Sequence, residues 1–156
     1  MGEDRPKLAE VLDRYRAIEG WNAEYLERWI AVTADEGLRG GLRSILRREQ
    51  AHAAELDARI RELGGAPRAE IPTRQREQAN AFYSSREAGD LAKLASLVDV
   101  FRDPETLLGF VIDAVRDRAT DDETRELLRT ILDDEKATID WVRAAHAART
   151  AARPTA

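Results

Sequence analysis

The chain has 156 residues, of which 43% are hydrophobic and 35% are charged, and its net charge is −5. This length suits one domain with a buried core, and the negative charge argues against binding to nucleic acid or to an anionic membrane surface. The absence of cysteine excludes disulfides, Fe–S clusters and thiolate metal sites. No apolar run approaches the roughly 20 residues that span a bilayer, and no secretory signal is visible, so we expect a cytoplasmic protein without membrane contact.

Apolar residues recur every three or four positions in four long segments, which predicts four amphipathic helices. We expect these helices at about residues 7–33, 36–63, 91–119 and 121–147. The Gly-Gly-Ala-Pro sequence at residues 64–67 ends the second helix. Residues 64–90 are expected to form a long crossover with one short extra helix, and residues 148–156 a frayed tail. The predicted fold class is all-α, in one domain over residues 1–156.

Three short sequences mark where helices begin. Residues 33–36 and 120–123 both match the S/T-x-x-E pattern of a capping box, which predicts a helix start at each. Pro104 interrupts the third apolar stripe. It either kinks one long helix or lies at the first position of a new helix that Asp103 caps.

Four glutamates lie inside the apolar stripes at regular distances. Glu19 and Glu49 are 30 positions apart, as are Glu105 and Glu135. Each lies 15 residues from the centre of the turn that joins its two helices, which is about 22 Å along a helix. We therefore expect all four carboxylates to meet at one level of a helical bundle.

The same glutamates belong to an internal repeat. Residues 12–52 align without gaps onto residues 98–138, an offset of 86 positions, with 11 identities in 41 positions. Two amphipathic hairpins of similar length would share leucines and isoleucines through helical phase alone. They would not share glutamates within the apolar stripes, so the sequence predicts two duplicated helical hairpins.

His52 follows Glu49 by three residues, on the same helix face. The equivalent residue in the second hairpin is Thr138. Buried carboxylates must be protonated or balanced by a cation, and no lysine or arginine interrupts the stripes at this level. Two divalent cations would balance four carboxylates, and carboxylate with imidazole suits iron, manganese or zinc. Alternatively, the glutamates reach solvent, or they are protonated and hydrogen-bonded to one another without metal.

Together, these motifs resemble those of the ferritin-like di-iron carboxylate superfamily, most closely its small rubrerythrin-like members. The resemblance covers about residues 7–147 and implies a ferritin-like four-helix bundle of two hairpins joined by the crossover. It implies that Glu49 and Glu135 bridge two metal positions. The full set of implied ligands is Glu19, Glu49, His52, Glu105 and Glu135. Thr138 would mark a vacated ligand position, and Asn22, one turn from Glu19, is expected to hydrogen-bond within the site.

This resemblance also implies a function. Members of the superfamily use iron or manganese to react with dioxygen or peroxide, so we expect one or two such ions per chain, without haem, and ferroxidase- or peroxidase-type oxidoreductase activity. Because Thr138 replaces a histidine, the second metal position is expected to be weak or vacant. The alternative is a metal-free, degenerate four-helix bundle that acts as a structural or interaction protein, such as a homodimer.

Overall fold

The computed structural model describes residues 4–152, and all regular secondary structure in this range is helical. This confirms the all-α prediction. The helices are α1 (Asp4–Val32), α2 (Glu36–Glu62), α3 (Thr73–Ser84), α4 (Asp90–Val100), α5 (Pro104–Leu107), α6 (Gly109–Arg116) and α7 (Asp122–Ala151). α3 is the short helix expected within the crossover.

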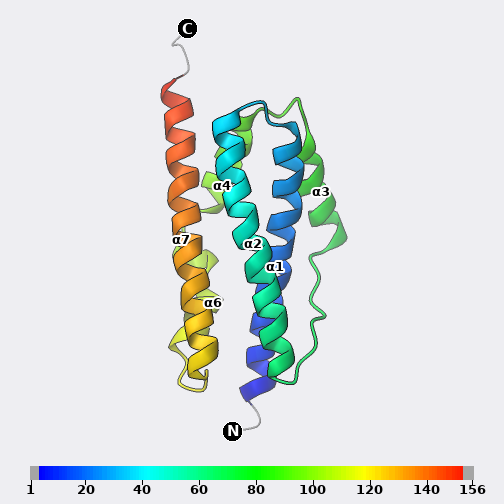
Figure 1. Cartoon of the computed structure of the whole chain (residues 1–156), viewed down its shortest axis with the longest axis vertical. Helices are drawn as coiled ribbons and strands as arrows, with labels where there is room; N and C mark the ends of the chain where they lie inside the picture. The colour runs from blue at the N-terminus through cyan, green and yellow to red at the C-terminus, as the bar shows by residue number, and fades with distance from the viewer. Residues whose placement is uncertain (1–3, 153–156) are drawn as a thin grey trace.

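Helices α1, α2 and α7 are long and run along the long axis of the molecule (Figure 1). α1 and α2 pack against each other as a hairpin, and α2 also contacts α7. After α2 the chain returns along the outside of α1 through residues 63–72 and α3. It then runs back through α4, α5 and α6 to the start of α7. α4 packs on α7, while α6 contacts both α1 and α7.

The single helix predicted at residues 91–119 is wrong, because the structure divides this segment into α4, α5 and α6. Pro104 lies in the first turn of α5, and the Asp103 side chain caps that helix by accepting from Thr106 N at 3.1 Å. Proline has no amide hydrogen and its ring clashes with the preceding helical turn, so α4 cannot continue through it. Of the two alternatives for Pro104, the structure shows the new helix.

Aspartates cap the two long helices that follow a turn. The Asp35 side chain accepts from Leu38 N at 2.9 Å, and the Asp121 side chain accepts from Thr124 N at 2.9 Å. The predicted helix starts are therefore right, but the capping residue in each case is the aspartate two or one positions after the threonine. Thr33 instead donates its hydroxyl hydrogen to Asp90 Oδ2 at 2.7 Å, which joins the end of α1 to the start of α4.

The predicted tail at residues 148–156 is wrong in its first part, since α7 continues to Ala151. The basic side chain of Arg149 explains part of this extension. Its guanidinium donates two hydrogen bonds to Asp35 Oδ2, at 2.9 and 2.7 Å, and so fixes the last turns of α7 to the start of α2. Residues 153–156 lie outside the described residues.

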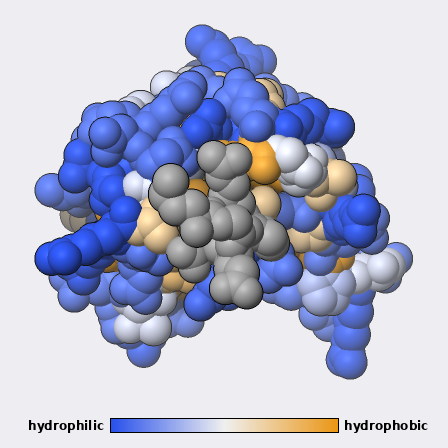
Figure 2. Space-filling model, turned by 90° about the horizontal axis from the view of Figure 1, so that it is seen from below, coloured by the Kyte–Doolittle hydropathy of each residue, from blue (hydrophilic) through white to orange (hydrophobic). Residues whose placement is uncertain are grey.

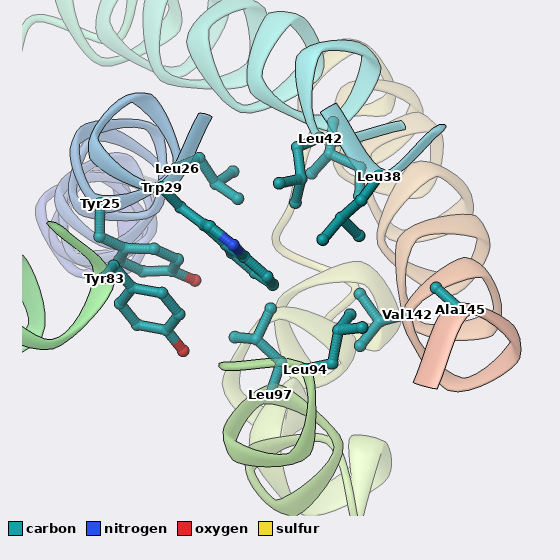
Figure 3. Packing of buried hydrophobic residues seen from close by; sticks show 11 residues of the cluster. Tyr25, Leu26, Trp29, Leu38, Leu42, Tyr83, Leu94, Leu97, Val142 and Ala145 are labelled. Carbon is teal, nitrogen blue, oxygen red and sulfur yellow. The ribbon is translucent and has the colours of Figure 1, made fainter. Parts of the chain in front are cut away.

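Buried apolar residues form two clusters. The upper core contains Tyr25, Leu26, Trp29, Leu38, Leu42, Ile45, Tyr83, Leu94, Leu97, Val142 and Ala145. The lower core contains Leu12, Tyr15, Leu56, Ile60, Val111, Ala114, Leu128 and Ile131. Figure 3 shows the Trp29 indole between leucines of α2 and leucines of α4. Complete burial of each such side chain contributes about 1.5–3 kcal/mol. The level at which the glutamates of the apolar stripes were expected to meet lies between the two cores.

Helices α2 and α7 approach each other closely at Gly41. A Cβ atom at this position would lie 1.9 Å from Cζ2 of Trp141, so only glycine leaves room for the indole. Trp141 packs against the upper core. Trp141 thus serves the packing of α7 on α2.

The surface seen from the N-terminal end of α1 is mostly hydrophilic, with small apolar areas (Figure 2). Among the described residues, no helix is long and apolar enough to cross a membrane.

Candidate metal centre

Four side chains that can bind metal converge between the two cores. They are Glu19 of α1, Glu49 and His52 of α2, and Glu135 of α7, and we call them the Glu/His cluster. Each side chain offers one ligand atom, and these atoms all lie within 4.8 Å of one another. The four residues are only 0–5% exposed. The structure therefore contradicts the alternative in which these glutamates reach solvent.

Helical spacing explains this convergence. Glu49 and His52 lie one turn apart on α2, between the buried residues Ile45 and Leu56 of the same face. Glu135 lies on the corresponding face of α7. Because the apolar residues above and below bind each helix to its neighbours, the acidic side chains between them are directed inward.

Glu105 does not join this group. It lies in the first turn of α5 and is exposed to solvent. The expectation that four carboxylates meet at one level is therefore wrong for Glu105, and three meet instead. The physical reason is the break at Pro104, which ends the helical phase on which the prediction depended.

Both ring nitrogens of His52 have carboxylate neighbours. Nδ1 lies 3.1 Å from Glu19 Oε2, within the cluster, and Nε2 lies 2.9 Å from Asp134 Oδ2 on α7. Asp134 is partly exposed, so it connects the buried imidazole to the protein surface. A ligand histidine commonly donates its other N–H to a carboxylate, which fixes the ring and raises its basicity. His52 and Asp134 have this arrangement.

The sequence analysis did not identify Asp134 as a neighbour of the cluster. The signal that could have found it is its position. Asp134 precedes Thr138 by four residues, so the two lie on one face of α7. The residue equivalent to Asp134 in the first hairpin is Arg48, 86 positions earlier.

Arg48 and Thr138 form the counterpart of the His52–Asp134 contact. Arg48 Nη2 donates to Thr138 Oγ1 at 3.0 Å. In the internal repeat, residue 48 matches residue 134 and residue 52 matches residue 138. A guanidinium and a hydroxyl therefore stand on one side of the cluster where the other side has a carboxylate and an imidazole. No lysine or arginine lies within the apolar stripes at this level, as predicted, but the Arg48 guanidinium reaches it from outside the stripe of α2.

Asn22 also contacts the cluster. Its side-chain amide donates to Glu49 Oε2 at 3.0 Å, which is the kind of hydrogen bond expected of it. Two other carboxylate oxygens, Glu19 Oε1 and Glu135 Oε1, are buried without a hydrogen-bond partner. An unpartnered buried carboxylate oxygen is costly, so the cluster has unused binding capacity.

Burial raises the pKa of all three carboxyl groups. The pKa of Glu19 is well above its usual value, because of burial and then of the nearby Glu135. Burial and the neighbouring Glu19 raise the pKa of Glu49. Burial, followed by repulsion from Glu49, raises the pKa of Glu135 to about 8. Without a cation, the group therefore retains protons at neutral pH.

The donor set fits one divalent cation. Three carboxylates and one imidazole are the ligands that iron, manganese and zinc accept, and their atoms surround one small volume. Residues 4–152 offer no comparable set for a second cation beside this one, because Glu105 is exposed elsewhere and Thr138 is hydrogen-bonded to a guanidinium. Comparisons of this chain with protein-family models, with curated proteins and with solved structures found no match.

Proposed function

We propose that this protein is a ferritin-like metal-binding protein that holds one iron or manganese ion per chain in the Glu/His cluster. The observation that carries the proposal is the placement of four buried ligand atoms within 4.8 Å of one another. Burying three carboxyl groups and an imidazole together costs several kcal/mol unless they are paired. A bound cation would offset this cost of burial, whereas packing alone would favour apolar residues at these positions.

Charge balance supports one ion over two. Three ionised carboxylates carry three negative charges, and a divalent cation leaves one of them uncompensated. Arg48 supplies the remaining positive charge, and its guanidinium offsets part of the rise in the pKa of Glu135 that burial and Glu49 cause. The guanidinium thus takes the electrostatic role that a second cation would have.

The fold proposal follows from the helix order. We propose that α1, α2, α7 and the segment from α4 to α6 are the four elements of a ferritin-like bundle. Residues 63–72 and α3 would then be its long crossover. The broken third element is the departure from a regular bundle, and it is the reason that one carboxylate ligand of a dinuclear site is missing.

The proposed chemistry is oxidation–reduction with dioxygen or peroxide. Hard carboxylate oxygens with one imidazole favour iron and manganese, which change oxidation state under physiological conditions. A bound iron or manganese ion would supply that redox change. The chain would contribute the ligands, the Asp134 carboxylate that orients His52, and a buried setting that excludes bulk water.

Metal analysis tests this proposal. The chelator-treated protein is loaded anaerobically with Fe²⁺, or with Mn²⁺, and bound metal per chain is measured after gel filtration. We expect one ion per chain in the unmodified protein and loss of stoichiometric binding in Glu49→Ala and in His52→Ala. Consumption of peroxide is then followed with the loaded protein and with both variants, which should be inactive.

The second histidine offers a matched control. His146 lies on α7 outside the Glu/His cluster, and it is the only histidine besides His52 in the sequence. His146→Ala should keep the full metal content. The metal proposal fails if the unmodified protein binds no stoichiometric iron or manganese, which would favour a metal-free cluster of protonated carboxyls.

A further inference from the structure

A cavity of about 660 Å³ lies beside the Glu/His cluster, and Glu19 and Glu135 form part of its wall. Its other walls come from α1, from residues 69–72, from α3, and from the broken segment of α4, α5 and α6. Small-molecule sites measure roughly 300–1,000 Å³ and are mainly apolar with a few polar groups. The cavity has both the size and the composition of such a site.

Packed aromatic rings hold one wall of the cavity in place. The rings of Tyr25 and Tyr83 stack with their centroids 4.5 Å apart, and Phe82 meets Tyr83 edge-on at 5.1 Å. All three residues line the cavity. Figure 3 shows the two tyrosine rings side by side, next to the upper core. Since the rings are fixed by the core behind them, the cavity is preformed.

Exposed apolar side chains mark its mouth. Val100 at the end of α4 is 52% exposed, and Leu107 at the end of α5 is 38% exposed. They are the exposed large hydrophobic residues of the part of the chain that the structure describes, and both line the cavity. Exposed apolar residues around a hollow are typical of a ligand entrance.

Buried polar atoms without partners gather in the same wall. Six buried side-chain atoms of the described residues have no hydrogen-bond partner. Four of them belong to residues that line the cavity, namely Tyr15 Oη, Glu19 Oε1, Trp21 Nε1 and Glu135 Oε1. Hydrogen bonding between the Tyr15 and Glu19 side chains accounts for part of this set. Buried polar groups are nearly always paired, and Trp21 Nε1 is the donor of this wall that a bound molecule would satisfy.

We propose that the cavity binds a small, mainly apolar organic molecule that ends in a hydroxyl group or another neutral hydrogen-bond donor. The apolar body lies against the aromatic wall and extends towards Val100. The polar end lies beside Glu19 and Glu135, where it donates to a carboxylate oxygen and accepts from the Trp21 N–H.

The charges around the cavity exclude an anionic end. Glu19, Glu70 and Glu135 line it, against a single basic residue, Arg14. The Arg14 guanidinium lies over the Phe110 ring, 4.5 Å from its centroid, and so is already engaged. A carboxylate buried beside Glu19 would therefore have no free cationic partner among the lining residues, which makes its burial costly.

Binding by the cavity does not require metal, whereas the role of the bound molecule as a substrate rests on the proposed function. The experiment therefore starts with metal-free protein. Decanol and decanoate, which share an apolar chain and differ in their polar end, are titrated into the protein. Binding is followed through the intrinsic tryptophan fluorescence, to which Trp21 of the cavity wall contributes. Both titrations are repeated after loading with Mn²⁺.

Three variants locate the binding. Ala79→Phe fills part of the cavity from α3 and should weaken decanol binding at least about 10-fold. Ala137→Phe adds the same bulk on the exposed face of α7 and should leave binding unchanged. Val100→Glu places a charge at the exposed mouth, where folding is not at risk, and should weaken decanol binding about 5-fold or more.

The expected result is saturable binding of decanol to metal-free protein, at least about 10-fold tighter than that of decanoate. No saturable decanol binding, or equal affinities of the unmodified protein and Val100→Glu, would overturn the inference. Decanoate binding as tight as decanol would overturn the assignment of the polar end. If Val100→Glu only converts a dimer to a monomer, the mouth is an interface between copies and the inference is wrong. If the unmodified protein binds decanol but retains no stoichiometric Mn²⁺ after loading, the metal proposal alone is refuted.

Discussion

The internal repeat relates residues 12–52 to residues 98–138. The two regions differ most in their first helix, where the repeat predicts that they agree. In the first half, α1 is one continuous helix of 29 residues that carries Glu19 into the interior. In the second half, the equivalent span consists of helices of 11, 4 and 8 residues, and Glu105 points to solvent. The comparison shows that helix continuity decides whether a glutamate in an apolar stripe becomes buried.

The second helices of the two predicted hairpins, α2 and α7, are more alike. α2 and α7 each carry a buried glutamate, Glu49 and Glu135, at the same level. They differ in the residue one turn later, where His52 has an acidic neighbour and Thr138 a basic one. As a result, one side of the Glu/His cluster has an imidazole beside a carboxylate, and the other has a hydroxyl beside a fixed positive charge.

The largest expected effect comes from the pair of equivalent glutamates. Glu19→Gln should lower the affinity for Mn²⁺ at least about 100-fold, because it removes an ionisable ligand from a buried site. Glu105→Gln should change the affinity by less than about 2-fold, since an exposed side chain far from the ligands contributes little. Calorimetric titration of both variants makes the measurement. Equal losses of Mn²⁺ affinity in the two variants would contradict the different roles assigned to Glu19 and Glu105.

Gly41 tests the packing of α2 on α7. Gly41→Ala should lower the free energy of unfolding by about 2–3 kcal/mol, because the added methyl group overlaps the Trp141 indole. Urea denaturation followed by circular dichroism measures the change. The matched control is the neighbouring Gly40, where a Cβ meets nothing within 4 Å. Gly40→Ala should be neutral or stabilise the protein by up to about 1 kcal/mol, and a similar loss in both variants would contradict the close approach.

The pH dependence of stability tests the buried carboxyls. In metal-free protein, the folded state raises the pKa of Glu135 from 4.5 to about 8. Folding therefore favours the protonated group, and this stabilisation is complete below pH about 4.5 and is lost as the pH rises through about 8. We expect the free energy of unfolding to fall by on the order of 2 kcal/mol over this window.

Glu135→Gln supplies the comparison for that measurement, because glutamine does not titrate. Its unfolding free energy, measured by urea denaturation across the same pH window, should change less with pH than that of the unmodified metal-free protein. Affinity for Mn²⁺ should rise over this window, since the ion binds the deprotonated ligands. A metal-free protein that gains stability between pH 5 and 8 would contradict the burial of three interacting carboxyls.

The smallest expected effect concerns the residue behind His52. Asp134→Asn should lower the affinity for Mn²⁺ about 10-fold, because the amide is a weaker acceptor for the His52 N–H. Asp133→Asn removes an adjacent, exposed carboxylate and should leave the affinity unchanged. If the two variants behave alike, general charge rather than the contact with His52 accounts for the loss.

Periodicity was sufficient to predict the long helices and the buried Glu/His cluster. The helix expected at residues 36–63 spans Glu36–Glu62, and the interior positions of Glu19, Glu49, His52 and Glu135 follow from helical phase. These predictions succeeded because each residue is part of a long, uninterrupted stripe whose apolar neighbours fix its direction.

The remaining features depend on contacts between distant segments. Pro104 allowed two interpretations, and only the packing of α4 on α7 and of α6 on α1 distinguishes them. Arg48 and Asp134 lie at the edges of their helix faces, where the periodic pattern does not say whether a long side chain turns inward. The cavity has no sequence signature, because its walls come from separate segments between Arg14 and Glu135.

Anomalous X-ray scattering from crystals of the manganese-loaded protein tests the central claim most directly. The account predicts one manganese peak per chain, surrounded by side-chain atoms of Glu19, Glu49, His52 and Glu135. The Arg48 guanidinium should still be hydrogen-bonded to Thr138. Two peaks bridged by Glu49 and Glu135 would contradict the single-ion site, as would a protein that binds no manganese in this cluster.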